Sequence, residues 1–140
     1  MPVSILRSAR AVSEARRLAP DAAVQLVHAI DIPLTFRQAL LRAGTSQGEM
    51  ERYRADRTAR AQEELAAFRR DTPGAGALPV RFLDGEPGAA LVRFSKRGRI
   101  DLLALGSHGR GAVAQTLLGS VARRVLAGAA CDVLVITRRQ

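Results

Sequence analysis

Apolar residues along the chain gather in short runs of strand length. Three of these runs, residues 24–31, 101–106 and 132–137, are largely apolar, and a fourth, residues 78–84, alternates apolar and polar positions. The runs at 101–106 and 132–137 are continuously apolar and end at a glycine or a polar residue, which is typical of strands buried on both faces of a parallel sheet. The pattern therefore predicts four strands.

Helical periodicity occupies two segments of the first half. One helix is expected between Ser8, a suitable N-cap residue, and Pro20, which cannot continue a helix. A second is expected over about residues 47–71, which are rich in Ala, Arg and Glu. The 3.6-residue period predicts the inward side chains of both helices: Ala11, Ala15, Leu18 and Ala19 in the first, and Ala61, Leu65 and Phe68 in the second.

Two further helices are expected in the second half. One begins near Pro87, a residue suited to a first helical turn, and stops near Gly98, whereas the other follows Gly119. Their inward side chains are predicted to be Ala90, Leu91 and Phe94 in the first helix, and Val121, Val125 and Leu126 in the second. Residues 32–48 fit either a short amphipathic helix ended by Gly44 or a mobile flap over a site.

Alternation of strands and helices predicts an α/β fold with an open, doubly wound, mostly parallel sheet and right-handed crossovers. Residues 1–140 are expected to form a single domain, because this length suits one hydrophobic core and no internal repeat is visible. No apolar run approaches the roughly 20 residues that a membrane-spanning helix needs. Since residues 1–10 do not resemble a secretory signal and Cys131 is the sole cysteine, cytoplasmic residence with an inert, half-buried thiol is expected.

A formal net charge of +9 raises the question of a nucleic-acid partner. All basic residues except Lys96 are arginines, scattered along the chain in pairs, and only five aromatic residues are present to stack on bases. This is a compositional preference for arginine rather than a patch. We expect weak, salt-sensitive affinity for polyanions but no specific nucleic-acid binding.

Candidate chemistry concentrates in residues 103–126, "LALGSHGRGAVAQTLLGSVARRVL". Gly106 ends a predicted strand and Gly119 and Ser120 open the last helix, so they fall at the carboxyl edge of the sheet, where helix N-termini offer free N–H groups to anions. Glycine allows the main chain to approach a phosphate closely, and Ser120 adds a hydroxyl donor. The segment matches neither the Walker A loop nor the GxGxxG dinucleotide fingerprint.

Catalytic constellations are not evident beside this loop. No metal-ligand cluster, Ser/His/Asp order or carboxylate pair accompanies it, and Asp101 and Asp132 fall at strand starts, the opposite edge of the sheet. Without a carboxylate to orient it, a lone loop histidine such as His108 is more often a turn residue than a general base. Any hydrolysis of a phosphate ligand bound at this loop is therefore expected to be slow.

The stretch "DLLALGSHGRGAVAQTLLGSVARRVLAGAACDVLVIT" strongly resembles the C-terminal half of the universal stress proteins. The spacing Gly106-x2-Gly109-x9-Gly119-Ser120 is similar to the signature of their ATP-binding branch. Upstream, "VQLVHAID" and "GEPGAALVRFSKRGRIDLLALG" resemble the family's second strand and third crossover, so the resemblance covers nearly all of residues 8–137.

The resemblance implies bound ATP, with Mg²⁺ as a possible companion, and a role in the stress response. By this resemblance Gly106 would lie against the ribose, Gly109, Gly119 and Ser120 would hold the α- and β-phosphates, and His108 and Val121 would fall at further contact positions. Leu105 and Ala29 would lie near the ribose or base. The family likeness further implies a homodimer through the edge strand at residues 132–137, together with protein partners that the sequence does not identify.

One part of the family pattern is missing. Family members begin with a strand that ends in an aspartate, in a pattern like Asp-x-Ser-x-x-Ser, and this strand is expected in the middle of the order 3-2-1-4-5. Alignment on the first helix places Val3 at the aspartate position, with almost nothing before it to form a strand. Either "PVSIL" is itself a shortened first strand, or the start is misassigned or truncated, or the sheet is altered.

Three functions from different classes are compatible with these residues. The first is a nucleotide-dependent regulator or binding partner that holds ATP on the glycine-rich loop. The second is a scaffold of the same fold that has lost nucleotide binding, because the aspartate at the nucleoside end is absent. The third is an arginine-rich module that binds polyanions.

Overall fold

The computed structural model describes residues 2–6, 8–107 and 118–137. Its centre is one sheet of five parallel strands in the order β3-β2-β1-β4-β5. The strands are β1 (Pro2–Leu6), β2 (Ala23–Ile30), β3 (Val80–Asp84), β4 (Leu102–Gly106) and β5 (Asp132–Ile136). This order and the alternation with helices confirm the predicted open, doubly wound α/β fold.

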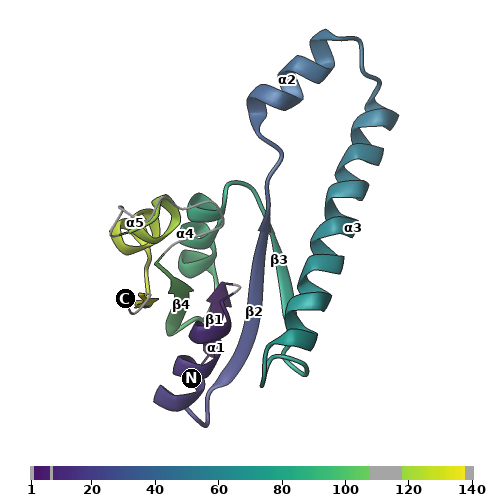
Figure 1. Ribbon diagram of the computed structural model, residues 1–140. Helices are drawn as coiled ribbons and strands as arrows, with labels where there is room; N and C mark the ends of the chain where they lie inside the picture. The colour runs from purple at the N-terminus through teal and green to yellow at the C-terminus, as the bar shows by residue number, and fades with distance from the viewer. Residues whose placement is uncertain (1, 7, 108–117, 138–140) are drawn as a thin grey trace.

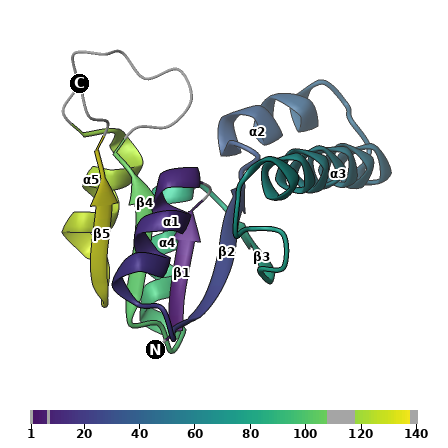
Figure 2. The same ribbon diagram turned by 60° about the horizontal axis from the view of Figure 1, so that its bottom comes forward.

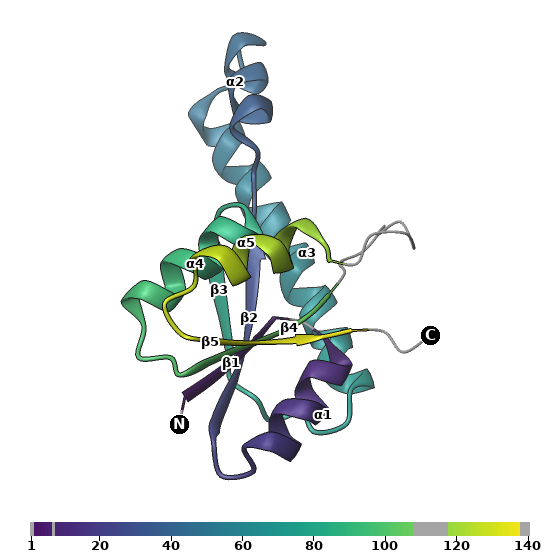
Figure 3. The same cartoon turned by 90° about the vertical axis from the view of Figure 1, so that its left-hand side faces the viewer.

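Helices cover both faces of the sheet. They are α1 (Ala9–Leu18), α2 (Leu34–Arg42), α3 (Gln47–Asp71), α4 (Pro87–Arg97) and α5 (Ser120–Gly128). One buried cluster joins α1 and α3 to the sheet through side chains such as Val12 and Leu65, and a second joins α4 and α5 through Leu91 and Val125. Figure 3 shows α4 and α5 on one face and α1 on the other.

The first strand is present and short. β1 pairs with β2 on one side and with β4 on the other, with Val3 opposite Val24 and Leu102. "PVSIL" is therefore the shortened strand, and its position in the middle of the sheet matches the expected order. The placement of Val3 at the carboxyl end of this strand was wrong, because the strand runs on to Leu6.

Helix α1 begins as the sequence predicts. The Ser8 hydroxyl accepts a hydrogen bond from the Ala11 amide at 3.3 Å, and Ala11 and Ala15 are fully buried together with Val12. Leu18 was predicted to face inward, but its side chain is 54% exposed. Leu18 is the last residue of α1, and the buried residues of this helix, Ala11, Val12 and Ala15, lie in its earlier turns.

Helices α4 and α5 pack side by side over the other face. The Glu86 carboxylate caps α4 by accepting hydrogen bonds from the amides of Gly88 and Ala89, at 2.9 and 2.8 Å. Partial burial raises the pKa of Glu86, but these amides, with Arg124 and Arg93, outweigh it and hold the pKa below its ordinary value.

The predicted inward side chains of these two helices are partly correct. Ala90, Leu91 and Phe94 are buried, as is Val125. Leu126 was predicted to be inward but is 48% exposed, because the inward stripe of α5 runs through Ala122 and Val125 instead.

Residues 34–60, which comprise α2 and the first part of α3, form a projection that we call the arm. Figure 1 shows the arm extending beyond the sheet, and Figure 2 shows it beside β2 and β3, on the opposite side of the molecule from β5. Helix α2 has no buried residue, and Gly44, with a φ of 81°, follows it. The segment is thus the short helix ended by Gly44 that the sequence allowed.

Candidate functional site

The carboxyl edge of the sheet is recessed at its middle strand. Leu6, the last residue of β1, pairs with Val27, so β2 continues through Ala29 to Ile30 beyond the end of β1. On the other side Ile5 pairs with Ala104, and β4 continues to Gly106. The strand order reverses direction at β1, because β2 and β3 lie on one side of it and β4 and β5 on the other. In open parallel sheets, ligands bind beyond the carboxyl ends of the strands at this position.

The two glycines at the ends of the glycine-rich segment meet at this edge. The Ser107 amide donates to the Ile136 carbonyl at 2.9 Å, which extends the pairing of β4 with β5. The Ser107 carbonyl then accepts a hydrogen bond from the Gly119 amide at 2.6 Å. The start of α5 is thereby fixed beside the end of β4, as the spacing of Gly106 and Gly119 predicted.

The N-terminus of α5 offers main-chain donors to an anion. Gly119 is the N-cap residue, and no side chain among the described residues caps this helix. The amides of Ser120 and Val121 have no acceptor within the helix, and the positive end of its dipole lies there. Because the Gly119 amide already donates to Ser107, the available donors are those of the next residues and the exposed Ser120 hydroxyl.

Three apolar residues predicted to lie near a nucleotide have different environments. Ala29 is half-buried near the end of β2, and Val121 is half-buried against the cluster under α4 and α5. The Leu105 side chain is only 1% exposed and belongs to that same cluster. A ligand at this edge would therefore meet Leu105 through its main chain. His108 and Gly109 lie outside the described residues.

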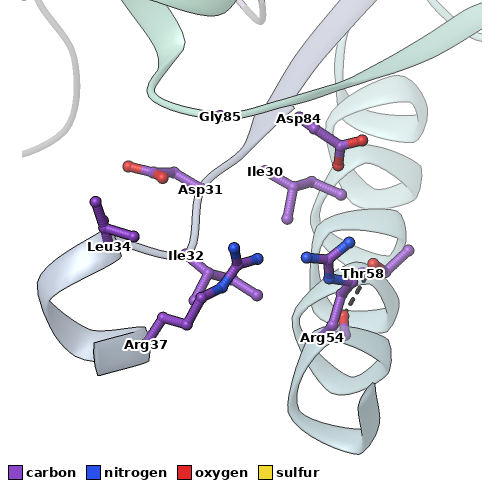
Figure 4. A pocket seen from close by; sticks show the side chains of 9 residues that line it. All are labelled: Ile30, Asp31, Ile32, Leu34, Arg37, Arg54, Thr58, Asp84 and Gly85. Carbon is purple, nitrogen blue, oxygen red and sulfur yellow. Dashed lines mark hydrogen bonds between the residues drawn. The ribbon is translucent and has the colours of Figure 1, made fainter. Parts of the chain in front are cut away.

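A hollow of about 310 Å³, which the sequence did not predict, lies beside Ala29 at the ends of β2 and β3 (Figure 4). It is lined by Ile30, Asp31, Ile32, Leu34, Arg37, Arg54, Thr58, Asp84 and Gly85. The Gly85 amide donates to the Ile30 carbonyl at 3.0 Å, which joins the ends of the two strands, and the φ of 115° at Gly85 suits glycine. The sequence indicated this hollow only indirectly, because a flap over a site was one of the two interpretations of residues 32–48, which include the lining residues Ile32, Leu34 and Arg37.

Cys131 lies away from this edge, just before β5. Its thiol is half-buried, and its pKa is raised: burial is the largest cause, the carboxylates of Asp132 and Asp101 add to it, and together they outweigh a backbone hydrogen bond at Leu103 that lowers the pKa. A raised pKa lowers the fraction of thiolate, the nucleophilic form. The arrangement agrees with the expected unreactive thiol.

The described part of the chain has neither a metal-binding cluster nor a membrane-spanning helix. No group of three or more His, Cys, Asp or Glu side chains there could hold a metal ion. No described helix combines the length and apolar character needed to cross a membrane.

Comparison with known proteins decides the family. Residues 7–137 match the model of the universal stress protein family. This chain belongs to the universal stress protein family. A universal stress protein of Thermus aquaticus is 30% identical over 137 residues, which cover 93% of this chain and 88% of that relative. Universal stress protein MJ0531 of Methanocaldococcus jannaschii is 36% identical over 61 residues, only 44% of this chain and 36% of the relative.

Solved structures of universal stress proteins share the fold. Hypothetical protein MJ0577 superimposes with a TM-score of 0.71 at 21% identity, covering 98% of this chain and 96% of that one. A family protein from Arabidopsis thaliana with AMP bound has a TM-score of 0.63 at 19% identity, covering 99% and 92%. A universal stress protein in complex with cAMP has a TM-score of 0.59 at 24% identity, covering 97% and 96%.

Proposed function

We propose that this universal stress protein binds ATP at the carboxyl edge of its sheet and acts in the cytoplasm as a nucleotide-dependent regulator or binding partner in the stress response. One observation carries the proposal: the hydrogen bond between Ser107 and Gly119 holds the uncapped N-terminus of α5 against the end of β4. The amides of Ser120 and Val121 and the Ser120 hydroxyl then form the phosphate cradle. Family members with bound AMP and cAMP support a nucleotide as the ligand.

The remaining contacts follow from the recess between β2 and β4. The ribose lies against Gly106, and the base extends toward Ala29 on β2. Gly109 completes the phosphate contacts and His108 lies at a further contact position, as the family resemblance implies. Mg²⁺ would accompany the nucleotide and offset the charge of its phosphates; the described residues contain no group of three or more His, Cys, Asp or Glu that could hold the ion.

This chain lacks the family's aspartate at the nucleoside end. The position at the carboxyl end of β1, two residues before the N-cap Ser8, is Leu6. Without a carboxylate to accept hydrogen bonds there, discrimination between bases rests on shape and apolar contact, which separate similar ligands weakly. Hydrolysis is at most slow: Asp101 and Asp132 lie at the amino ends of β4 and β5, and the carboxylates at the carboxyl edge, Asp31 and Asp84, lie at the ends of β2 and β3 rather than at the proposed cradle at α5.

Isothermal titration with ATP and with GTP, each with Mg²⁺, tests this proposal. We expect saturable binding of both, with affinities within about fivefold of each other, since a lost base contact is worth roughly 1 kcal/mol. The adenine absorbance of the freshly purified protein is an independent measurement. Absence of both heat and absorbance would support the alternative, a scaffold of the same fold that does not bind nucleotide.

We further propose a homodimer formed through β5. This strand lies at the edge of the sheet, and Val133, Leu134, Val135 and Ile136 are half-buried in a single chain. An apolar strand with a free hydrogen-bonding edge is stabilised by pairing with a second copy across a two-fold axis. Light scattering at micromolar concentration should give twice the monomer mass, and a monomer mass would contradict the proposal.

A further inference from the structure

Two arginines face each other across the hollow between the arm and the sheet. Arg37 projects from α2 and Arg54 from α3, and Figure 4 shows their guanidinium groups directed toward one another. Both side chains also line an adjoining hollow of about 430 Å³ between α2 and α3, together with Ile32. Arg37 is half-buried, so its charge is partly removed from water.

Neither guanidinium has a partner within the described part of the chain. Among the described residues, the side chains of Arg37 and Arg54 form no hydrogen bond or ion pair. The neighbouring Arg57 donates to the main-chain carbonyl of Asp31 at 2.8 Å, which ties α3 to the end of β2. Two facing cations without a counter-ion repel each other.

Carboxylates also border this region, on its strand side. Asp31 and Asp84 line the first hollow from the strand ends, whereas Glu51, which lines the second hollow, belongs to helix α3. In Figure 4 the Asp31 carboxylate is directed away from both guanidinium groups, whereas Asp84, the last residue of β3, lies nearer to Arg54 than to Arg37. In the first hollow both arginines thus come from the helices and both carboxylates from the strand ends, so an anion would bind there against the helices.

We propose that Arg37 and Arg54 form a second anion site that takes a polyvalent oxyanion of the phosphoryl class, separate from the cradle at α5. A tetrahedral phosphoryl group accepts hydrogen bonds from two guanidinium forks at once, and such charge-assisted bonds are the strong ones. The cradle is at β4 and α5, whereas this site is at β2 and β3, with β1 between them in the sheet. A bridging anion would also fasten α2, which has no buried residue, to α3.

Titration of inorganic pyrophosphate into the full chain tests the site, with and without saturating ATP. Arg37→Gln and Arg54→Gln should each weaken pyrophosphate binding about tenfold or more. Asp84→Asn, which removes a nearby negative charge, should strengthen it about two- to fivefold. The matched control is Arg60→Gln, because Arg60 is exposed on the same helix α3 and lines neither hollow; it should have no effect.

A second measurement reads the arm itself. Amide hydrogen exchange of residues 34–42 should slow when pyrophosphate is added to the unmodified protein and should not change for Arg37→Gln. Binding that competes with ATP and is unaffected by Arg37→Gln would place pyrophosphate in the cradle and overturn the proposal. An equal loss of pyrophosphate and ATP affinity in Arg37→Gln would also overturn a separate second site, because it would assign the nucleotide's own phosphates to these arginines. If ATP does not bind at all, the pyrophosphate affinities of Arg37→Gln, Arg54→Gln and Arg60→Gln still test this site, because they are measured without ATP.

Discussion

Ser120→Asp is expected to reduce ATP affinity at least 100-fold while leaving the protein as stable as before or slightly more so. A carboxylate in the first turn of α5 favours the helix dipole, by about 0.3–1 kcal/mol at an exposed position, and Ser120 is exposed. The same charge would lie where the phosphates are proposed to bind. Two like charges 4 Å apart repel by about 4 kcal/mol at an effective dielectric constant of 20.

The matched control is Ser120→Asn, which has nearly the same shape as the aspartate without its charge. It replaces the small hydroxyl with a neutral carboxamide, which lies farther from the main chain, and should weaken ATP binding about tenfold. Thermal unfolding and titration calorimetry of the three proteins separate stability from binding. Equal ATP affinity for the aspartate variant and the unmodified protein would mean that no phosphate binds at the N-terminus of α5.

The meeting of β4 and α5 at the carboxyl edge could be predicted because it depends on main-chain geometry. A buried strand that ends at Gly106 and a helix that opens after Gly119 must both reach the carboxyl edge of a parallel sheet. No particular side chain has to be placed to reach that conclusion. The structure adds the hydrogen bond from Gly119 to Ser107, which commits one of the amides expected to face a phosphate.

The first strand was harder to predict because it was sought through its aspartate. A central strand needs only main-chain groups that can pair on both sides, and "PVSIL" supplies them. Pro2 lacks an N–H group but is tolerated because it is the first residue of the strand. The pairing of backbone groups could thus form although the family's side-chain pattern was absent.

The anion hollow could not be predicted because its members come from separate elements. Arg37 and Arg54 lie on two helices whose relative placement depends on the turn at Gly44 and on the tie between Arg57 and Asp31. In sequence they are two arginines among many in a strongly basic chain. Periodicity predicts which side of a helix faces the core, but it does not predict which exposed side chains of two helices will face each other.

Leu65→Ala is expected to lower the free energy of unfolding by about 2–5 kcal/mol, the usual loss for a leucine removed from a packed core. Leu65 is 2% exposed and packs with Val12 of α1 and Leu26 of β2. Helix α3 is 25 residues long, yet Ala61 and Leu65 are its buried side chains. Leu65 therefore provides much of the attachment of the arm, and the variant should also raise hydrogen exchange along α3.

Leu41→Ala is the matched control for this prediction, since it makes the same chemical change on α2. Leu41 is 55% exposed and borders the hollow between the arm helices, so its loss should change the free energy of unfolding by less than about 0.5 kcal/mol. Urea unfolding of both variants measures the difference. A cost for Leu41→Ala comparable to that of Leu65→Ala would mean that α2 is packed against something in solution, either the rest of the chain or a second copy. The exposed apolar side chains of α2, Leu34, Phe36 and Leu41, would then be an interface rather than a free surface.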